Sequence, residues 1–233
     1  MLLSFPNWII HIFSALEWGV ALAMLYRYGK LIGRKDVRRF ALFMIPHWIG
    51  SWFVLAYHLS VDSIPFLLDM SEAINLVGSI ALLYAAIRIL KGPEKQGAAV
   101  MGALVLGSTA FTGHPQSYLG NNVFDAILQV SSVVYMSFLV LLLKIRKKEP
   151  ELFSGLMVGG FWFVLVFISV TVFCIYLSTE VRGYPTLSHD DLLHALAESL
   201  LSISNLMIVL GIHRQTRQAE NRLMKTQGLS SAR

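Results

Sequence analysis

The sequence predicts an all-α, polytopic bundle of transmembrane helices. Hydrophobic residues make up 55% of the 233 residues and charged residues only 14%, a balance outside the range of soluble domains. The mean hydropathy is +0.62. Apolar runs alternate with short basic clusters, and most runs approach the roughly 20 residues that a helix needs to cross a bilayer core. We therefore expect an integral membrane protein whose first partner is the lipid bilayer.

Seven apolar segments follow one another along the chain, and each predicts one span. They occupy residues 7–27, 40–60, 65–88, 97–113, 122–143, 152–178 and 192–212. The first has no basic residue ahead of it, so it does not resemble a cleaved signal peptide and is expected to remain as a span. The fourth is short and rich in small residues, which also fits a re-entrant segment or a buried loop.

The distribution of Lys and Arg favours seven spans over six. If all seven segments cross, 18 of the 19 basic residues fall on one side, and Arg182 is the exception. Basic residues near span ends stay on the cytoplasmic side, or on the stromal side in a plastid. If 97–113 did not cross, the cluster at 144–148 would move to the opposite side. The prediction is an outer N-terminus and an inner C-terminus, with no nucleic-acid face among these dispersed clusters.

The seven segments predict a three-one-three arrangement. We divide the chain into a first three-helix unit (1–92), a short linking helix with an outer loop (93–118), a second three-helix unit (119–213) and a basic cytoplasmic tail (214–233). The two three-helix units would then have the same orientation, which is the geometry of a parallel repeat. The tail is expected to be a frayed helix.

Ionisable and amide side chains within the spans are the candidate functional residues. A charge at the bilayer centre costs about 2.5 kcal/mol or more, so such residues should face the bundle interior, be paired or be neutral. Most of them fall in the predicted outer half. The candidates for a ligand-binding or polar cluster are His11, Glu17, His47, His58, Glu72, Asn75, His194, Glu198 and Asn205.

Glu17 is the candidate deepest in the first span, and we expect it to have a hydrogen-bond partner on another helix. Its candidate neighbours are His58, Glu72, His194 and Glu198. On the last span, His194, Glu198 and Asn205 share one helical face, because steps of four and seven return to nearly the same direction.

Simpler roles remain open for the same residues. His11, His58 and His194 lie close enough to the predicted outer surface to be ordinary headgroup-level histidines. His47 follows Pro46 and would help to satisfy backbone groups freed by the proline. Asn75 and Asn205 are also explained as interhelical hydrogen-bonding residues.

No catalytic motif occurs in the chain. HExxH, CxxC, GxSxG and the phosphate-binding GxxxxGK[ST] are all missing, so no catalytic residue is assigned and a non-enzymatic protein is preferred. His194 and Glu198 are spaced i, i+4 and could supply two metal ligands, with a third from another helix. A bis-histidine haem is a further option. The sequence alone does not assign a metal site, and chlorophyll, carotenoid and haem remain candidate cofactors.

Several stretches resemble a known family. WIIHIFSALEWGVALAMLYRYG, IPHWIGSWFVLAYH and EAINLVGSIALL resemble the hypothetical chloroplast reading frame forty-nine family, uncharacterised membrane proteins of cyanobacteria and plastids. Residues 124–213, ending HALAESLLSISNLMIVLG, are similar to a second uncharacterised membrane domain of oxygenic phototrophs. The His11–Glu17–Trp18 and His194–Glu198–Asn205 patterns carry the likeness. The resemblance implies a thylakoid or plasma membrane of a cyanobacterium, or a plastid membrane, and brings no established activity.

Two functional classes follow from these observations. The preferred one is a non-enzymatic binding, scaffold or assembly factor for photosynthetic membrane complexes, which could hold chlorophyll or carotenoid through a histidine. The alternative is a small-solute or proton-coupled carrier, because the three-one-three arrangement resembles that of the SWEET sugar carriers. Their proline-glutamine signature lies within a helix, whereas Pro115-Gln116 falls in a predicted loop here. A carrier predicts a hydrated cavity that reaches Glu17 or Glu198; a scaffold predicts a filled centre.

Overall fold

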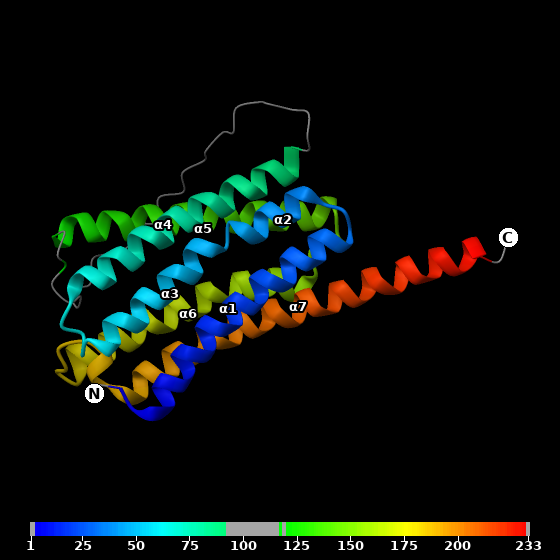
Figure 1. Cartoon of the computed structure of the whole chain (residues 1–233). Helices are drawn as coiled ribbons and strands as arrows, with labels where there is room; N and C mark the ends of the chain where they lie inside the picture. The colour runs from blue at the N-terminus through cyan, green and yellow to red at the C-terminus, as the bar shows by residue number, and fades with distance from the viewer. Residues whose placement is uncertain (1–2, 92–116, 118–119, 232–233) are drawn as a thin grey trace.

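The computed structural model describes residues 3–91, 117 and 120–231, and the regular elements within them are helical. The long elements are α1 (Phe5–Leu31), α2 (Lys35–Leu42), α3 (Ile45–Leu59), α4 (Pro65–Lys91), α5 (Asn121–Lys148), α6 (Gly155–Tyr176) and α7 (Asp191–Ser231). A π-helical turn, η1 (Leu177–Val181), and a 3-10 turn, η2 (Leu187–His189), connect α6 to α7. Figure 1 shows the long helices lying roughly alongside one another.

Within the described part of the chain, six helical stretches are long and apolar enough to span a membrane, which confirms the predicted class. They are Phe5–Leu31, Lys35–Leu59, Pro65–Lys91, Asn122–Lys148, Gly155–Val181 and Asp191–Lys225. The predicted span at 97–113 lies outside the described residues. The predicted second span is made of two helices, α2 and α3, which are interrupted at Phe43 and Met44 just before Pro46. Proline lacks the N–H that a continuous helix requires at this point.

The helices α4 and α5 lie side by side and run in the same direction. Near their beginnings, the Ser117 hydroxyl donates to Asp69 Oδ2 at 3.0 Å. Near their ends, Lys148 Nζ donates to the Leu90 carbonyl at 2.9 Å. The first and last turns of the two helices therefore lie at the same two ends of the bundle.

Around the bundle, α1 packs against α3 and α7, and α4 packs against α3 and α5. The helix α6 packs extensively along α7 and more briefly against α5. The two three-helix units consequently meet along two seams, α1 with α7 and α4 with α5 (Figure 1).

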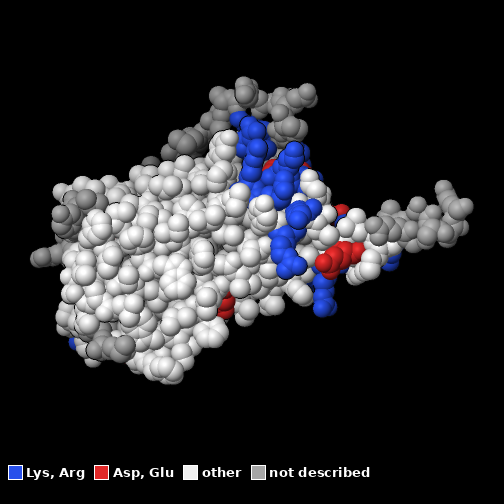
Figure 2. Space-filling model, in the orientation of Figure 1, with Lys and Arg blue, Asp and Glu red and all other residues white. Residues whose placement is uncertain are grey.

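Basic side chains gather at one end of the bundle, which we call the basic end. Figure 2 shows Lys and Arg there, beside a body formed mostly by other residues. Their positions close to helix termini explain this, with Lys30 in the last turn of α1, Arg88 in that of α4 and Arg146 in that of α5. Arg34 hydrogen bonds to Asp36 and Glu149, at 2.8 and 2.6 Å, and these contacts raise the pKa of its guanidinium.

The helix α7 continues past the bundle at the basic end as a single projecting helix (Figure 1). It extends through Ser231, so the structure has a continuous helix where the sequence predicts a frayed tail.

An aromatic core fills the bundle between its middle and the basic end. Phe40, Phe138, Phe153 and Phe161 are all 0% exposed. The ring centroid of Phe40 lies 5.3 Å from that of Phe153, and those of Phe138 and Phe161 are 5.4 Å apart. Trp18 of α1 adds an edge contact to Phe161. The side chains of both units therefore interlock here, within the distances typical of favourable aromatic pairs.

Candidate functional site: a buried histidine cluster

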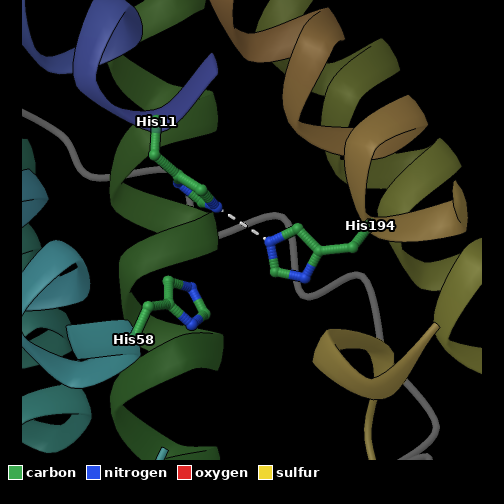
Figure 3. Close-up of side chains that lie close together, drawn as sticks. All are labelled: His11, His58 and His194. Atoms are coloured by element: carbon green, nitrogen blue, oxygen red, sulfur yellow. Dashed lines mark hydrogen bonds between the residues drawn. The ribbon is translucent and has the colours of Figure 1, made fainter. Parts of the chain in front are cut away.

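Three histidines from three helices meet at the end of the bundle opposite the basic end. His11 lies on α1, His58 on the last turn of α3 and His194 on the first turn of α7. One ring nitrogen of each lies within 4.8 Å of the others. The residues are only 6%, 8% and 5% exposed. Figure 3 shows the three rings pointing toward one another, and we call this group the histidine cluster.

His11 and His194 are in direct contact across the boundary between the two units. Their Nε2 atoms are 2.8 Å apart, so one ring donates a proton and the other accepts it. The His58 ring centroid lies 4.9 Å from that of His11 and 5.2 Å from that of His194. Headgroup-level histidines would be expected to keep contact with water, whereas these rings are withdrawn from it and face each other.

Two carboxylates lie behind the rings. Asp62 Oδ1 is 2.8 Å from His58 Nδ1, and Glu198 Oε2 is 3.7 Å from His11 Nδ1. The Nδ1 atom of His194 is buried and has no hydrogen-bond partner among the described residues. The carboxylates thus approach the Nδ1 side of two rings, while the Nε2 atoms of His11 and His194 point into the cluster.

Asp62 reaches His58 because the chain reverses sharply after α3. Val61 and Asp62 have φ values of 58° and 57°, in the left-handed region that a β-branched residue such as valine rarely adopts. The Asp62 amide donates to the Tyr57 carbonyl at 3.1 Å, which holds the reversal in place. Strain of this kind persists only where the surroundings impose it, and it frequently marks functional sites. Sequence reasoning missed Asp62, although its i, i+4 spacing from His58 is a usable signal.

A row of polar contacts between α1 and α7 continues from the cluster toward the middle of the bundle. We call this row the polar seam. Its side-chain pairs are Asn7 with Asp191 at 2.7 Å, His11 with His194 at 2.8 Å, Ser14 with Asn205 at 2.9 Å and Glu17 with Ser202 at 2.8 Å. Steps of three or four residues on α1, and of three or eight on α7, keep each helix's members near one face. Both helices start at the same end, and the two inner contacts cross, because Ser14 pairs with Asn205 whereas Glu17 pairs with Ser202.

Glu17 has the partner on another helix that the sequence predicts. The Ser202 hydroxyl donates to Glu17 Oε2, so the partner is a serine rather than one of the four ionisable neighbours that were considered. Asn205 donates to the carbonyl and the hydroxyl of Ser14 at 3.0 and 2.9 Å. Glu17 and Asn205 therefore lie on the seam, deeper than the histidine cluster.

The remaining candidates lie elsewhere. His47 and Asn75 pack between α3 and α4, where His47 Nε2 is 3.3 Å from the Ser79 hydroxyl. Asn75 Oδ1 lies 2.5 Å from where a Cβ on Gly50 would stand, so this glycine makes room for the amide. Near Pro46, Trp18 rather than His47 donates to a backbone carbonyl, that of Met44 at 3.0 Å. Glu72 lies partly buried on α4 and takes no part in the contacts that build the cluster.

The fold and site define a multi-pass helical membrane protein with a buried polar cluster shared by two units. Comparison with known proteins then shows two families. Residues 2–88 match a protein of unknown function (DUF2499), and residues 124–217 match a protein of unknown function (DUF3593). A Ycf49-like protein of Synechocystis sp. (strain ATCC 27184 / PCC 6803 / Kazusa) is 29% identical over 86 residues, which cover 36% of this chain and 83% of the relative. No solved structure matches the chain.

These matches confirm the predicted resemblance to an uncharacterised two-domain protein of cyanobacteria and plastids. They also divide the site. His11 and His58 fall within the first matched region and His194 within the second. The histidine cluster is therefore complete only where the two domains are packed together.

Proposed function

We propose that this protein is a non-enzymatic binding and assembly factor of a photosynthetic membrane, and that the histidine cluster is its binding site. The cyanobacterial relative and the membrane-spanning helices support the setting. The observation that carries the proposal is the polar seam, which fastens the first unit to the second through α1 and α7. A fixed pairing of this kind suits a protein that presents a site to a partner.

The alternative, a carrier, requires the two units to rock against each other around the site. Such rocking would have to part the polar seam and repack the aromatic core. A side-chain hydrogen bond within a membrane contributes about 0.6 kcal/mol on average. A buried polar group left without its partner costs more, at least about 1–3 kcal/mol. Breaking the seam would therefore cost several kcal/mol, which favours a binding and assembly role over carriage.

We also propose seven spans, with the N-terminus outside and the C-terminus inside. Because α4 and α5 run in parallel, Lys91 and Ser117 stand at opposite ends of the bundle. If both helices cross the membrane, the chain between them has to return to the first side. The concentration of Lys and Arg at the basic end supports placing that end inside.

The experiment that tests the function cross-links α1 to α7 within the polar seam. Ser14→Cys and Asn205→Cys are combined in the Cys174→Ser background and joined by a short, reductant-cleavable cross-linker in a cyanobacterial strain that lacks the native chain. The readout is the content of chlorophyll–protein complexes on native gels. We expect the strain without the protein to contain less of them, and the locked protein to restore them as well as the uncross-linked protein does.

The matched control joins His47→Cys with Ser79→Cys, a pair in contact within the first unit alone. Restoration only after reductant cleaves the Ser14–Asn205 link, with the control pair active in both states, would support the carrier instead. An unchanged complex content in the strain without the protein would refute the assembly role.

A further inference from the structure

We propose that His11, His58 and His194 bind one divalent transition-metal ion of the Zn²⁺ class, each through one ring nitrogen. The inference deepens the proposed function and rests on it, because it names the ligand of the same site. It starts from the convergence of three buried imidazoles, supplied by three helices of two units, with a nitrogen of each within 4.8 Å of the others.

The spacing of the nitrogens suits a small metal ion. Zinc–nitrogen bonds of about 2.0–2.1 Å in a tetrahedron place the ligand atoms about 3.3 Å apart. The His11 and His194 Nε2 atoms are 2.8 Å apart, and one ring nitrogen can be taken from each of the three histidines so that no two are more than 4.8 Å apart. To reach the tetrahedral spacing, the distance between any two of these nitrogens has to change by no more than about 1.5 Å. Rotation of the side-chain torsions can supply this without moving a helix.

The carboxylates are placed as the outer partners of metal-bound histidines. Asp62 holds Nδ1 of His58, which leaves Nε2 as the nitrogen available to an ion. Glu198 approaches Nδ1 of His11 only to 3.7 Å, beyond hydrogen-bond distance, while Nε2 of His11 faces the cluster. A carboxylate that is hydrogen-bonded to a ring, as Asp62 is, fixes the tautomer and orientation of that ring and raises the basicity of the ring as a ligand.

The charges also suit a dication. A double positive charge buried at this depth needs compensation, since uncompensated ions are costly away from water. Asp62 and Glu198, when ionised, provide two negative charges next to the rings. Two carboxylates and one divalent ion sum to zero, and the three imidazoles bind while neutral.

The type of ligand atom limits which metal ion the site can bind. Imidazole suits zinc, copper, nickel and iron, whereas magnesium and calcium prefer oxygen ligands in larger number. Three histidines leave one coordination position for water or another ligand, unlike a closed four-ligand structural site. The ion would also join the two domains, since two of its ligands come from residues 2–88 and one from residues 124–217.

Metal content of the purified full-length chain tests the inference. The protein is produced with an affinity tag that has no histidines, stripped with chelator, incubated with Zn²⁺ and desalted, and the metal is measured by mass spectrometry. We expect one equivalent per chain. His11→Ala, His58→Ala and His194→Ala should each retain less than a tenth of that amount. The control His47→Ala, at a histidine that contacts Ser79 rather than the cluster, should retain one equivalent.

Three further measurements support the metal content, and the first two keep the test independent of folding. Asp62→Asn leaves all three ligands and should weaken Zn²⁺ binding roughly 10- to 100-fold. Co²⁺ in place of Zn²⁺ should give the visible absorption of a nitrogen-coordinated ion in the unmodified chain and not in His194→Ala. The unmodified chain should also unfold at a temperature higher by roughly 5–10 °C at a hundredfold excess of Zn²⁺ over its Kd.

Sub-stoichiometric metal in the unmodified chain, or equal binding by the cluster variants and the His47→Ala control, would overturn the inference. A Soret band in the protein as isolated would overturn it in favour of haem, and chlorophyll or carotenoid absorption lost in the same variants would do so in favour of pigment. Failure here leaves the cross-linking result standing, because that experiment needs no metal. Conversely, suppose that the chain binds one equivalent of Zn²⁺ but restores the complexes only after the Ser14–Asn205 link is cleaved. That result would refute only the assembly role.

Discussion

Replacing Gly160 by alanine should loosen the packing of α6 on α7, whereas the same replacement at the adjacent Gly159 should not. A Cβ on Gly160 would lie 2.6 Å from Ile208 Cγ1, 2.9 Å from the Ser204 carbonyl oxygen and 3.0 Å from the Ile208 amide nitrogen. Two of these atoms belong to the backbone, so α7 itself has to move. A Cβ on Gly159 would meet only Met207 Cε, at 3.5 Å, which is ordinary contact.

The magnitude follows from three contributions. Overpacking costs typically 1–3 kcal/mol, or about 2 kcal/mol here. The hydrogen bond from the Ser204 hydroxyl to the Gly160 carbonyl, 2.8 Å long, is strained or lost, at about 0.6 kcal/mol. Helix propensity offsets about 0.8 kcal/mol, because alanine is a better helix former than glycine. The net loss for Gly160→Ala is about 2 kcal/mol.

Thermal unfolding of the purified protein in one detergent measures this difference. A loss of about 2 kcal/mol should lower the Tm of Gly160→Ala by roughly 4–8 °C. Gly159→Ala shares the propensity gain without the collision, so its Tm should stay unchanged or rise slightly. Equal Tm values for the two variants would refute the close approach of α6 and α7 at Gly160.

Two further predictions concern topology and the seam. In the Cys174→Ser background, Ser117→Cys should react with a membrane-impermeant thiol reagent that is added outside. Ser154→Cys should react only when the reagent is added inside. Reaction of Ser117→Cys from the inside alone would exclude seven spans. Glu17→Gln retains an acceptor for the Ser202 hydroxyl and should keep the Tm within about 2 °C. Glu17→Leu removes the partner of this partly buried hydroxyl and should lower the free energy of unfolding by about 1 kcal/mol. Equal stability of the Gln and Leu variants would show that this contact contributes nothing.

The all-helical, membrane-spanning class was predictable from the sequence because lipid imposes simple requirements. Span length and the distribution of basic residues indicate helices and their ends without knowledge of tertiary contacts. The break within the second span was harder to predict. Pro46 was visible in the sequence, yet the interruption comes at Phe43 and Met44, where Trp18 of another helix donates to the Met44 carbonyl. The break therefore reflects the local proline together with a contact from α1 that no local pattern contains.

The sequence predicted which face of a helix carries the site residues, but not which other helix that face contacts. The spacing of His194, Glu198 and Asn205 placed them on one face of the last span, and in the structure Asn205 contacts α1 and Glu198 approaches it. Spacing within a helix cannot tell which other helix will face it. His58 joins His11 while His47, eleven residues earlier on nearly the same face, contacts α4 instead. The ring of His47 occupies the space left by Gly78, where a Cβ would lie 2.4 Å from it.

The polarity of the α1–α7 interface changes along its length, and this gradient favours binding over passage. From the end where both helices begin, α1 contributes polar residues down to Glu17 and then buried Ala21, Leu25 and Tyr28. On α7, buried Asn205 is followed in the same direction by buried Ile208 and Ile212, and buried Gln215, which binds the Ser154 amide, lies one turn further on at the basic end. A hydrophilic solute would have to continue from Glu17 into a region sealed by aliphatic and aromatic side chains. A ligand that enters and leaves from the histidine end would not, since its polar partners lie within the first half of the bundle.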